Sequence, residues 1–151
     1  MTILVDTNIL LRVVDQSAAE HSICVDALRR LDDLGHELAI CAQVMIEFWS
    51  VATRPLKANG LGLEPKSAAQ FLNGLCNSLR VLPEPPDVAS VWRQIVERYS
   101  VISKQAHDAR LVALMQAHNL PQLLTLNTSD FSRYSQILLL NPQDAIALKK
   151  P

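Results

Sequence analysis

The chain has 151 residues, of which 49% are hydrophobic and 19% charged, with 14 basic and 15 acidic residues and a formal net charge of −1. This composition predicts one globular domain with a sizeable core and excludes an intrinsically disordered chain. The near-neutral balance provides no overall positive field for a polyanion. Any contact with nucleic acid must therefore depend on local groups or on a metal ion.

Short β-branched and aliphatic runs alternate with helical patterns along the chain. We predict a first strand in the apolar run that starts almost at the first residue and ends at Asp6, and further strands at residues 37–41, 80–82, 122–126 and 136–140. We predict helices at residues 9–14, 18–34, 42–53, 66–79, 85–99 and 108–119, with a flexible loop at 56–64. This alternation predicts an α/β fold: a single domain over residues 1–151, with a central, mostly parallel five-stranded sheet flanked by helices.

Cysteines and apolar runs indicate the cellular setting. Cys24, Cys41 and Cys76 are an odd number without a C-x-x-C pair, and each lies in an apolar pattern. We therefore expect reduced core thiols in a cytoplasmic protein. Neither a secretory leader nor a stretch of membrane-spanning length is present, so no membrane association is expected.

Asp6 ends the first apolar run, immediately before a helical pattern. The carboxyl end of a strand in an open α/β sheet is where ligands bind. No glycine lies nearby, so this turn is not a glycine-rich loop that cradles a phosphate. A simpler interpretation is that Asp6 only caps the helix that follows.

Two further acids interrupt apolar helix faces. Glu47 shares a face with Val44 and Phe48, and Asp108 shares one with Leu111, by the spacing of an α-helix. An ionised carboxylate is costly to bury without a partner. Each acid alone has an ordinary explanation, such as an arginine partner for Glu47 or the favourable helix dipole for Asp108. Together with Asp6, however, they would converge at one edge of the sheet.

A polar cluster containing Thr125, Asn127 and Asp130 follows the fourth predicted strand, although an ordinary turn has the same composition. Carboxylates gathered without His or Cys are hard oxygen ligands that suit Mg²⁺ or Mn²⁺. Such a metal activates water and stabilises charge on a phosphate. The predicted reaction is therefore metal-dependent hydrolysis of phosphodiester bonds.

Four segments of the chain resemble, in order, the motifs of PIN-domain ribonucleases. They are residues 5–10 (VDTNIL), 44–55 (VMIEFWSVATRP), 107–113 (HDARLVA) and 124–131 (LTLNTSDF). Each motif is weak alone, but together they are specific and span nearly the whole chain, within residues 3–140.

The resemblance implies an Mg²⁺- or Mn²⁺-dependent endoribonuclease that acts on RNA. Chain length makes it look like a VapC-type toxin of a toxin–antitoxin pair, a homodimer silenced by a small cognate antitoxin. The implied site contains four catalytic acids, of which the first three would bind the metal, and four supporting residues: Asp6, Asp108, Glu47 and Asp130, with Thr7, Asn8, Thr125 and Asn127.

One position departs from the family pattern, because Asn127 stands where the last motif often has an acid. Two alternatives therefore stay open: a PIN nuclease of RNA maturation that is not a toxin, and a PIN-fold binding module with impaired catalysis. Five basic residues are candidate phosphate contacts, although solvated surface charges are the simpler interpretation: Arg12, Arg54, Lys57, Lys104 and Arg110.

Overall fold

Five short strands form one sheet in the computed structural model, which describes residues 1–149. The strands are β1 (Thr2–Val5), β2 (Glu37–Cys41), β3 (Arg80–Leu82), β4 (Gln122–Leu124) and β5 (Leu138–Leu140). Their order is β3-β2-β1-β4-β5, and every neighbouring pair is parallel. The predicted α/β fold with a five-stranded sheet is confirmed, and the sheet is entirely parallel rather than mostly so.

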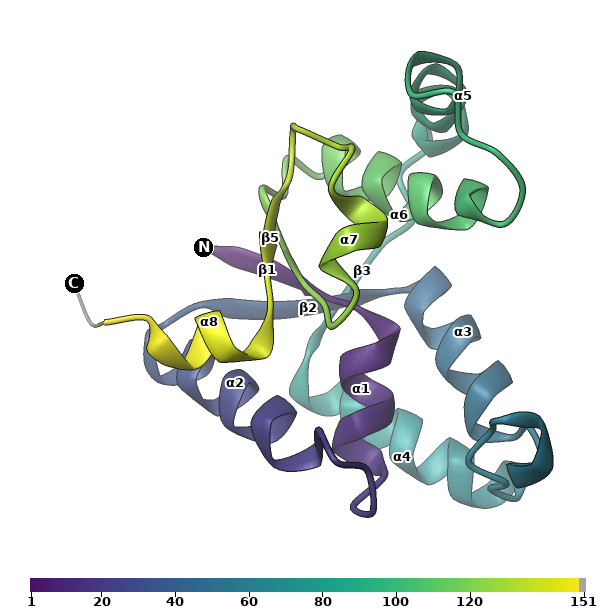
Figure 1. Ribbon diagram of the computed structural model, residues 1–151, viewed down its shortest axis with the longest axis vertical. Helices are drawn as coiled ribbons and strands as arrows, with labels where there is room; N and C mark the ends of the chain where they lie inside the picture. Colours follow the sequence, from purple (N-terminus) through teal and green to yellow (C-terminus); the bar gives the residue numbers. More distant parts are fainter. Residues whose placement is uncertain (150–151) are drawn as a thin grey trace.

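Helices cover both faces of the sheet, as Figure 1 shows, with α1, α2, α4 and α8 on one side and α5 and α6 on the other. Strand β1 is accordingly apolar throughout its centre, since Ile3, Leu4 and Val5 are fully buried. The helices are α1 (Thr7–Val14), α2 (His21–Asp33), α3 (Ala42–Ala52), α4 (Pro65–Ser78), α5 (Val88–Arg98), α6 (Gln105–Ala117), α7 (Thr128–Phe131) and α8 (Pro142–Ala147), with a 3₁₀ turn, η1 (Leu56–Ala58).

Several boundaries differ from the sequence prediction for local reasons. Helix α6 begins three residues before Asp108, after a turn in which Ser103 has a positive φ of 53°. Helices α7 and α8 were not predicted, because they have only four and six residues. Helix α8 has clear start signals, since the Asn141 side chain accepts from the Asp144 N–H at 2.8 Å and Pro142 opens the first turn.

The predicted flexible loop after α3 is instead tied to that helix. Backbone N–H groups of residues 61–63 donate to the carbonyls of Val51, Ala52 and Arg54 at 2.8–3.0 Å, which satisfies the end of α3. Gly60 is required here, because a Cβ at this position would lie 2.0 Å from the Arg54 carbonyl oxygen. The loop therefore holds Arg54 in a defined place.

The predicted cysteine chemistry agrees with the structure. Cys24 and Cys41 are buried, Cys76 is partly buried, and all three thiols are free. Burial raises the pKa of Cys24 to about 11. None of the helices within residues 1–149 combines the length and hydrophobicity needed to cross a bilayer.

Candidate active site

Asp6 lies where the order of the sheet reverses. Strand β1 is central, with β2 on one side and β4 on the other, and α1 starts directly after Asp6. The Asp6 N–H donates to the Leu124 carbonyl at 3.0 Å, so this residue still belongs to the end of the sheet. A parallel sheet binds its ligands at such a point.

The Asp6 carboxylate is buried and held by three donors. Its Oδ1 accepts from the Thr7 N–H at 2.8 Å, and its Oδ2 accepts from Asn8 Nδ2 at 2.9 Å and from the Thr125 hydroxyl at 2.7 Å. Asp6 therefore is the N-cap of α1, as the simpler interpretation held, and also lines a pocket. The two interpretations of this residue are compatible.

Burial raises the pKa of Asp6 above its ordinary value. The three hydrogen bonds favour the charged form and act against this increase, whereas the nearby negative charge of Glu47 adds to it. A buried carboxylate of this kind gains if a cation neutralises its charge.

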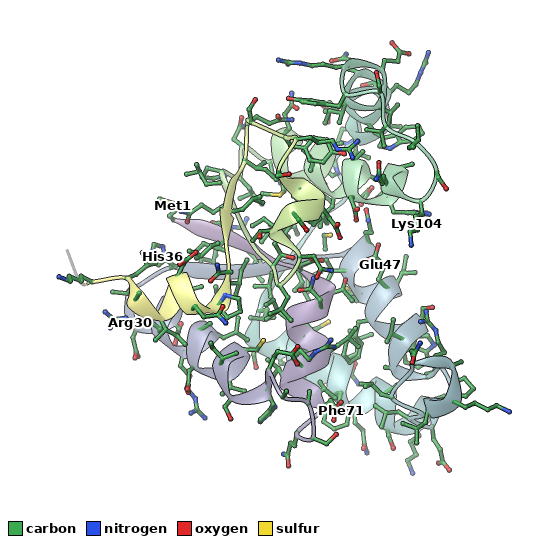
Figure 2. The ribbon with its side chains drawn as sticks, in the orientation of Figure 1. Met1, Arg30, His36, Glu47, Phe71 and Lys104 are labelled. Atoms are coloured by element: carbon green, nitrogen blue, oxygen red, sulfur yellow. The ribbon has the colours of Figure 1, made fainter. Side chains whose placement is uncertain are left out.

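Glu47 is half-buried on α3 and faces Thr7 at the start of α1. The Thr7 hydroxyl donates to Glu47 Oε2 at 3.0 Å, and Gln43 Nε2 donates to Glu47 Oε1 at 2.9 Å. The partners of this acid are thus neutral donors rather than the arginine considered from the sequence. Figure 2 shows Glu47 on α3, near the end of the sheet from which α1 begins.

Asp108 and Asp130 complete a group of four acids on one pocket. Asp108 comes from the first turn of α6 and is half-buried, whereas Asp130 comes from α7 and is exposed. Burial, followed by the negative charges of Asp130, Asp6 and Glu47, raises the pKa of Asp108 to about 6. The four predicted acids are therefore close enough to repel one another.

The segment after β4 forms the far side of the site. Thr125 is fully buried, and its hydroxyl accepts from the Asn127 N–H at 3.0 Å and from the Asn8 side chain at 3.1 Å. Asn8 Oδ1 in turn accepts from the Leu126 N–H at 3.1 Å. Thr125 and Asn8 therefore join the ends of β1 and β4. Asn127 is exposed and lines the pocket beside Asp130.

The pocket has a volume of about 310 Å³ and is lined by residues from α1, α3, α6 and α7. As placed, no group of three or more His, Cys, Asp or Glu side chains within residues 1–149 has the geometry to hold a metal ion. The donor chemistry nevertheless fits Mg²⁺ or Mn²⁺, because Mg²⁺ keeps several waters and binds through one or two carboxylates together with substrate phosphates.

Of the five basic candidates, Arg54 lines the acidic pocket. Arg12 pairs with Glu20 at 3.3 Å, and Arg110 pairs with Glu84. Lys57 lies on η1 and Lys104 precedes α6, and both are exposed, as expected for solvated surface charges.

The sequence interpretation missed Gln43 and Ser50, which also belong to this part of the molecule. Gln43, Glu47, Ser50 and Arg54 are separated by four, three and four positions, so they form a polar stripe along one face of α3 and its end. Ser50 and Arg54 line the acidic pocket, and Gln43 contacts Glu47. The spacing of these polar residues was the signal that would have identified them.

Comparison with known proteins shows the family. Residues 3–137 match the PIN domain. The chain belongs to the PIN-domain family. The predicted resemblance is thereby confirmed, although residues 150 and 151 of the predicted domain lie outside the described residues. Proteins of this family are nucleases. No curated protein sequence matches this PIN domain at a significant level.

Solved structures share the fold. They include VapBC2 from Rickettsia felis bound to a DNA fragment from its promoter, with a TM-score of 0.70, 18% identity, and coverage of 93% of this chain and 98% of that one. VapBC-1 from nontypeable Haemophilus influenzae has a TM-score of 0.68 and 15% identity, with coverage of 95% of this chain and 99% of that one. FitAB bound to the IR36 DNA fragment has a TM-score of 0.63 and 22% identity, with coverage of 93% of this chain and 94% of that one.

Proposed function

We propose that this PIN domain is a divalent-metal-dependent endoribonuclease and the toxin of a type II toxin–antitoxin pair. The observation that carries the nuclease proposal is the convergence of Asp6, Glu47, Asp108 and Asp130 on one pocket, where their repulsion contributes to the raised pKa of Asp108. Membership of a nuclease family supports the same reaction class.

Asp6 and Asp108 would be the main ligands of Mg²⁺ or Mn²⁺, and Glu47 would complete the set directly or through water. Once bound, the metal would lower the pKa of a water and stabilise negative charge on the phosphate. The protein contributes orientation: three donors fix the Asp6 carboxylate, and Thr7 and Gln43 fix that of Glu47.

The remaining pocket residues suit contact with a nucleic acid backbone. Arg54 provides a guanidinium at the pocket, which is a good partner for a phosphate. Asp130 is exposed and is proposed as the fourth acid, which accepts a proton from the attacking water. Asn127 would contact the metal or its waters through its amide oxygen without adding charge. The substrate would be single-stranded or looped RNA.

The proposed partners follow from the family resemblance. Fold similarity to the VapBC and FitAB structures supports a small cognate antitoxin as the partner. The toxin itself would act in the cytoplasm as a homodimer. Growth arrest on expression, relieved by coexpression of a small neighbouring gene, is the expected behaviour of a toxin. Expression without growth arrest would instead favour a PIN nuclease of RNA maturation.

The nuclease test uses purified protein and a labelled single-stranded RNA with Mg²⁺ or Mn²⁺. We expect cleavage by the wild type, and none with a chelator or with Asp6→Asn. Asp26→Asn on α2 is the matched control, because Asp26 is an exposed helical acid outside the pocket. Cleavage that persists in Asp6→Asn or with a chelator would contradict the proposal.

One observation favours a second candidate, a PIN-fold binding module with impaired catalysis. Asn127 occupies a pocket position where the family's last motif often has an acid. Calorimetric titration distinguishes the two: a binding module would bind the antitoxin but not Mg²⁺ or Mn²⁺, whereas the nuclease binds both.

A further inference from the structure

Gln43 is one of few polar residues that this chain buries. Within residues 1–149, the buried polar and charged residues are Asp6, Thr7, Gln43 and Thr125. Three of these contact one another at the end of β1, and the fourth, Gln43, contacts Glu47 of the same pocket. A buried amide is costly unless its donors and acceptor are all used, so its partners indicate its purpose.

Both N–H donors of the Gln43 amide and its carbonyl oxygen have hydrogen-bond partners. Its Nε2 donates to Glu47 Oε1 at 2.9 Å and to the His107 carbonyl at 2.8 Å, and its Oε1 accepts from Arg110 Nη1 at 3.1 Å. The His107 carbonyl belongs to the residue directly before Asp108. One amide therefore connects the carboxylate of Glu47 on α3 to the backbone that carries Asp108 on α6.

Arg110 determines which way the amide points. If the amide were reversed, its oxygen would face a carboxylate and a carbonyl, and its nitrogen would face the Arg110 guanidinium, which only donates. Arg110 is itself paired with Glu84, which follows β3. The amide is thus held by groups from α6 besides its own helix, and Arg110 connects it further to Glu84.

We propose that Gln43 is a positioning residue, which sets the separation and orientation of Glu47 and Asp108 for the metal. This inference rests on the proposed function. Gln43 lies behind Glu47 rather than on the acidic pocket itself, so it acts through the two acids and needs no contact with substrate. Gln43 lines a neighbouring pocket of about 440 Å³, together with Glu47 and with Arg110 and His107 of α6.

The test replaces Gln43 with Met, which has similar length but cannot donate or accept as an amide does. We expect Mn²⁺ affinity, measured by calorimetry on the full chain, to fall roughly 10-fold or more, as is typical when an outer partner of a metal ligand is lost. In RNA cleavage, we expect kcat to fall by a similar factor while KM for RNA changes little. Gln70→Met, at an exposed position of α4, is the matched control and should leave both unchanged.

A second variant separates positioning from folding. Arg110→Met leaves the Gln43 side chain intact but removes the donor to its carbonyl, so Mn²⁺ affinity should fall by a smaller factor. The double variant should be no weaker than Gln43→Met. If Gln43→Met does not fold, the test rests on folded Arg110→Met. A lower Mn²⁺ affinity in this variant would support the role of Gln43, and an affinity equal to that of the wild type would overturn it.

Comparison of the wild type with Asp6→Asn separates the proposed metal site from the proposed role of Gln43. Mn²⁺ binding by the wild type, lost in Asp6→Asn, shows that the metal site exists. Wild-type Mn²⁺ affinity in a folded Gln43→Met would then overturn only the role of Gln43. A wild type that binds no Mn²⁺ would overturn the proposed function and this inference together.

Discussion

Replacement of Asp108 by Asn would remove one of four acids that repel one another across the pocket. Burial and the charges of Asp130, Asp6 and Glu47 raise the pKa of Asp108 from 3.8 to about 6. The native state therefore binds a proton that the unfolded state has already lost between these two pH values. The free energy of unfolding consequently falls as the pH rises through this window, and the loss is complete above about pH 6.

The magnitude follows from the pKa difference. A change of one in pKa corresponds to about 1.4 kcal/mol, so a rise from 3.8 to about 6 corresponds to at most about 3 kcal/mol. Asp108 is half-exposed, and solvent screening reduces this to about 1.5 kcal/mol. For a chain of this length, that free energy corresponds to a melting temperature about 3–6 °C higher.

The measurement is thermal unfolding of the metal-free protein, with a chelator present, at pH 3.8 and pH 7.5. We expect Asp108→Asn to melt higher than the wild type at pH 7.5 and equally at the lower pH, and Asp26→Asn to show neither effect. Mn²⁺ should then raise the melting temperature of the wild type more than that of Asp108→Asn. If Asp108→Asn raised the melting temperature equally at both pH values, or did not raise it at pH 7.5, repulsion among the acids would not be the cause.

Two further predictions concern stability. Thr125→Val preserves shape but removes a hydroxyl that donates to Asp6, so the free energy of unfolding in urea should fall by about 1–3 kcal/mol; an unchanged midpoint would show that the bond contributes nothing. Gly60→Ala should lower the melting temperature and weaken RNA binding, because its Cβ would collide with the Arg54 carbonyl. Gly74→Ala on α4 is the control, because nothing lies within 4 Å of a Cβ at this position. Alanine in a helix should increase the free energy of unfolding by roughly 0.5–1 kcal/mol. Equal behaviour of the two glycine variants would contradict this account of the loop.

Periodicity predicted the sheet and the long helices because those elements bury whole faces. The predicted bounds of β2 and β3 agree with the structure, those of α3 differ by one residue at its end, and those of α4 differ by one residue at each end. Short elements depend on local capping instead. Helix α8 begins through the Asn141 side chain and Pro142, and α7 has a single turn, so neither has enough residues to show a hydrophobic period.

The sequence also indicated acids that line the pocket: Glu47 and Asp108 because a carboxylate on an apolar helix face is unusual, and Asp6 because it ends a strand. It did not indicate which groups hold them. The partners of Glu47 are Thr7, 40 residues away, and Gln43, whose amide contacts the backbone of His107, 64 residues away. Such pairings depend on how α1, α3 and α6 are packed, which no local pattern encodes.

The central position of β1 has a consequence for biosynthesis. The ribosome produces Asp6 well before Thr125, because the Thr125 hydroxyl that holds its carboxylate is 119 residues further along the chain. Strand β4, which pairs with β1, is also made late. A nascent chain therefore carries the first acid long before its binding partners exist. The complete acidic pocket can form only after the ribosome has made β4 and the segment that follows it, so a shorter nascent chain should lack the nuclease activity proposed for this domain.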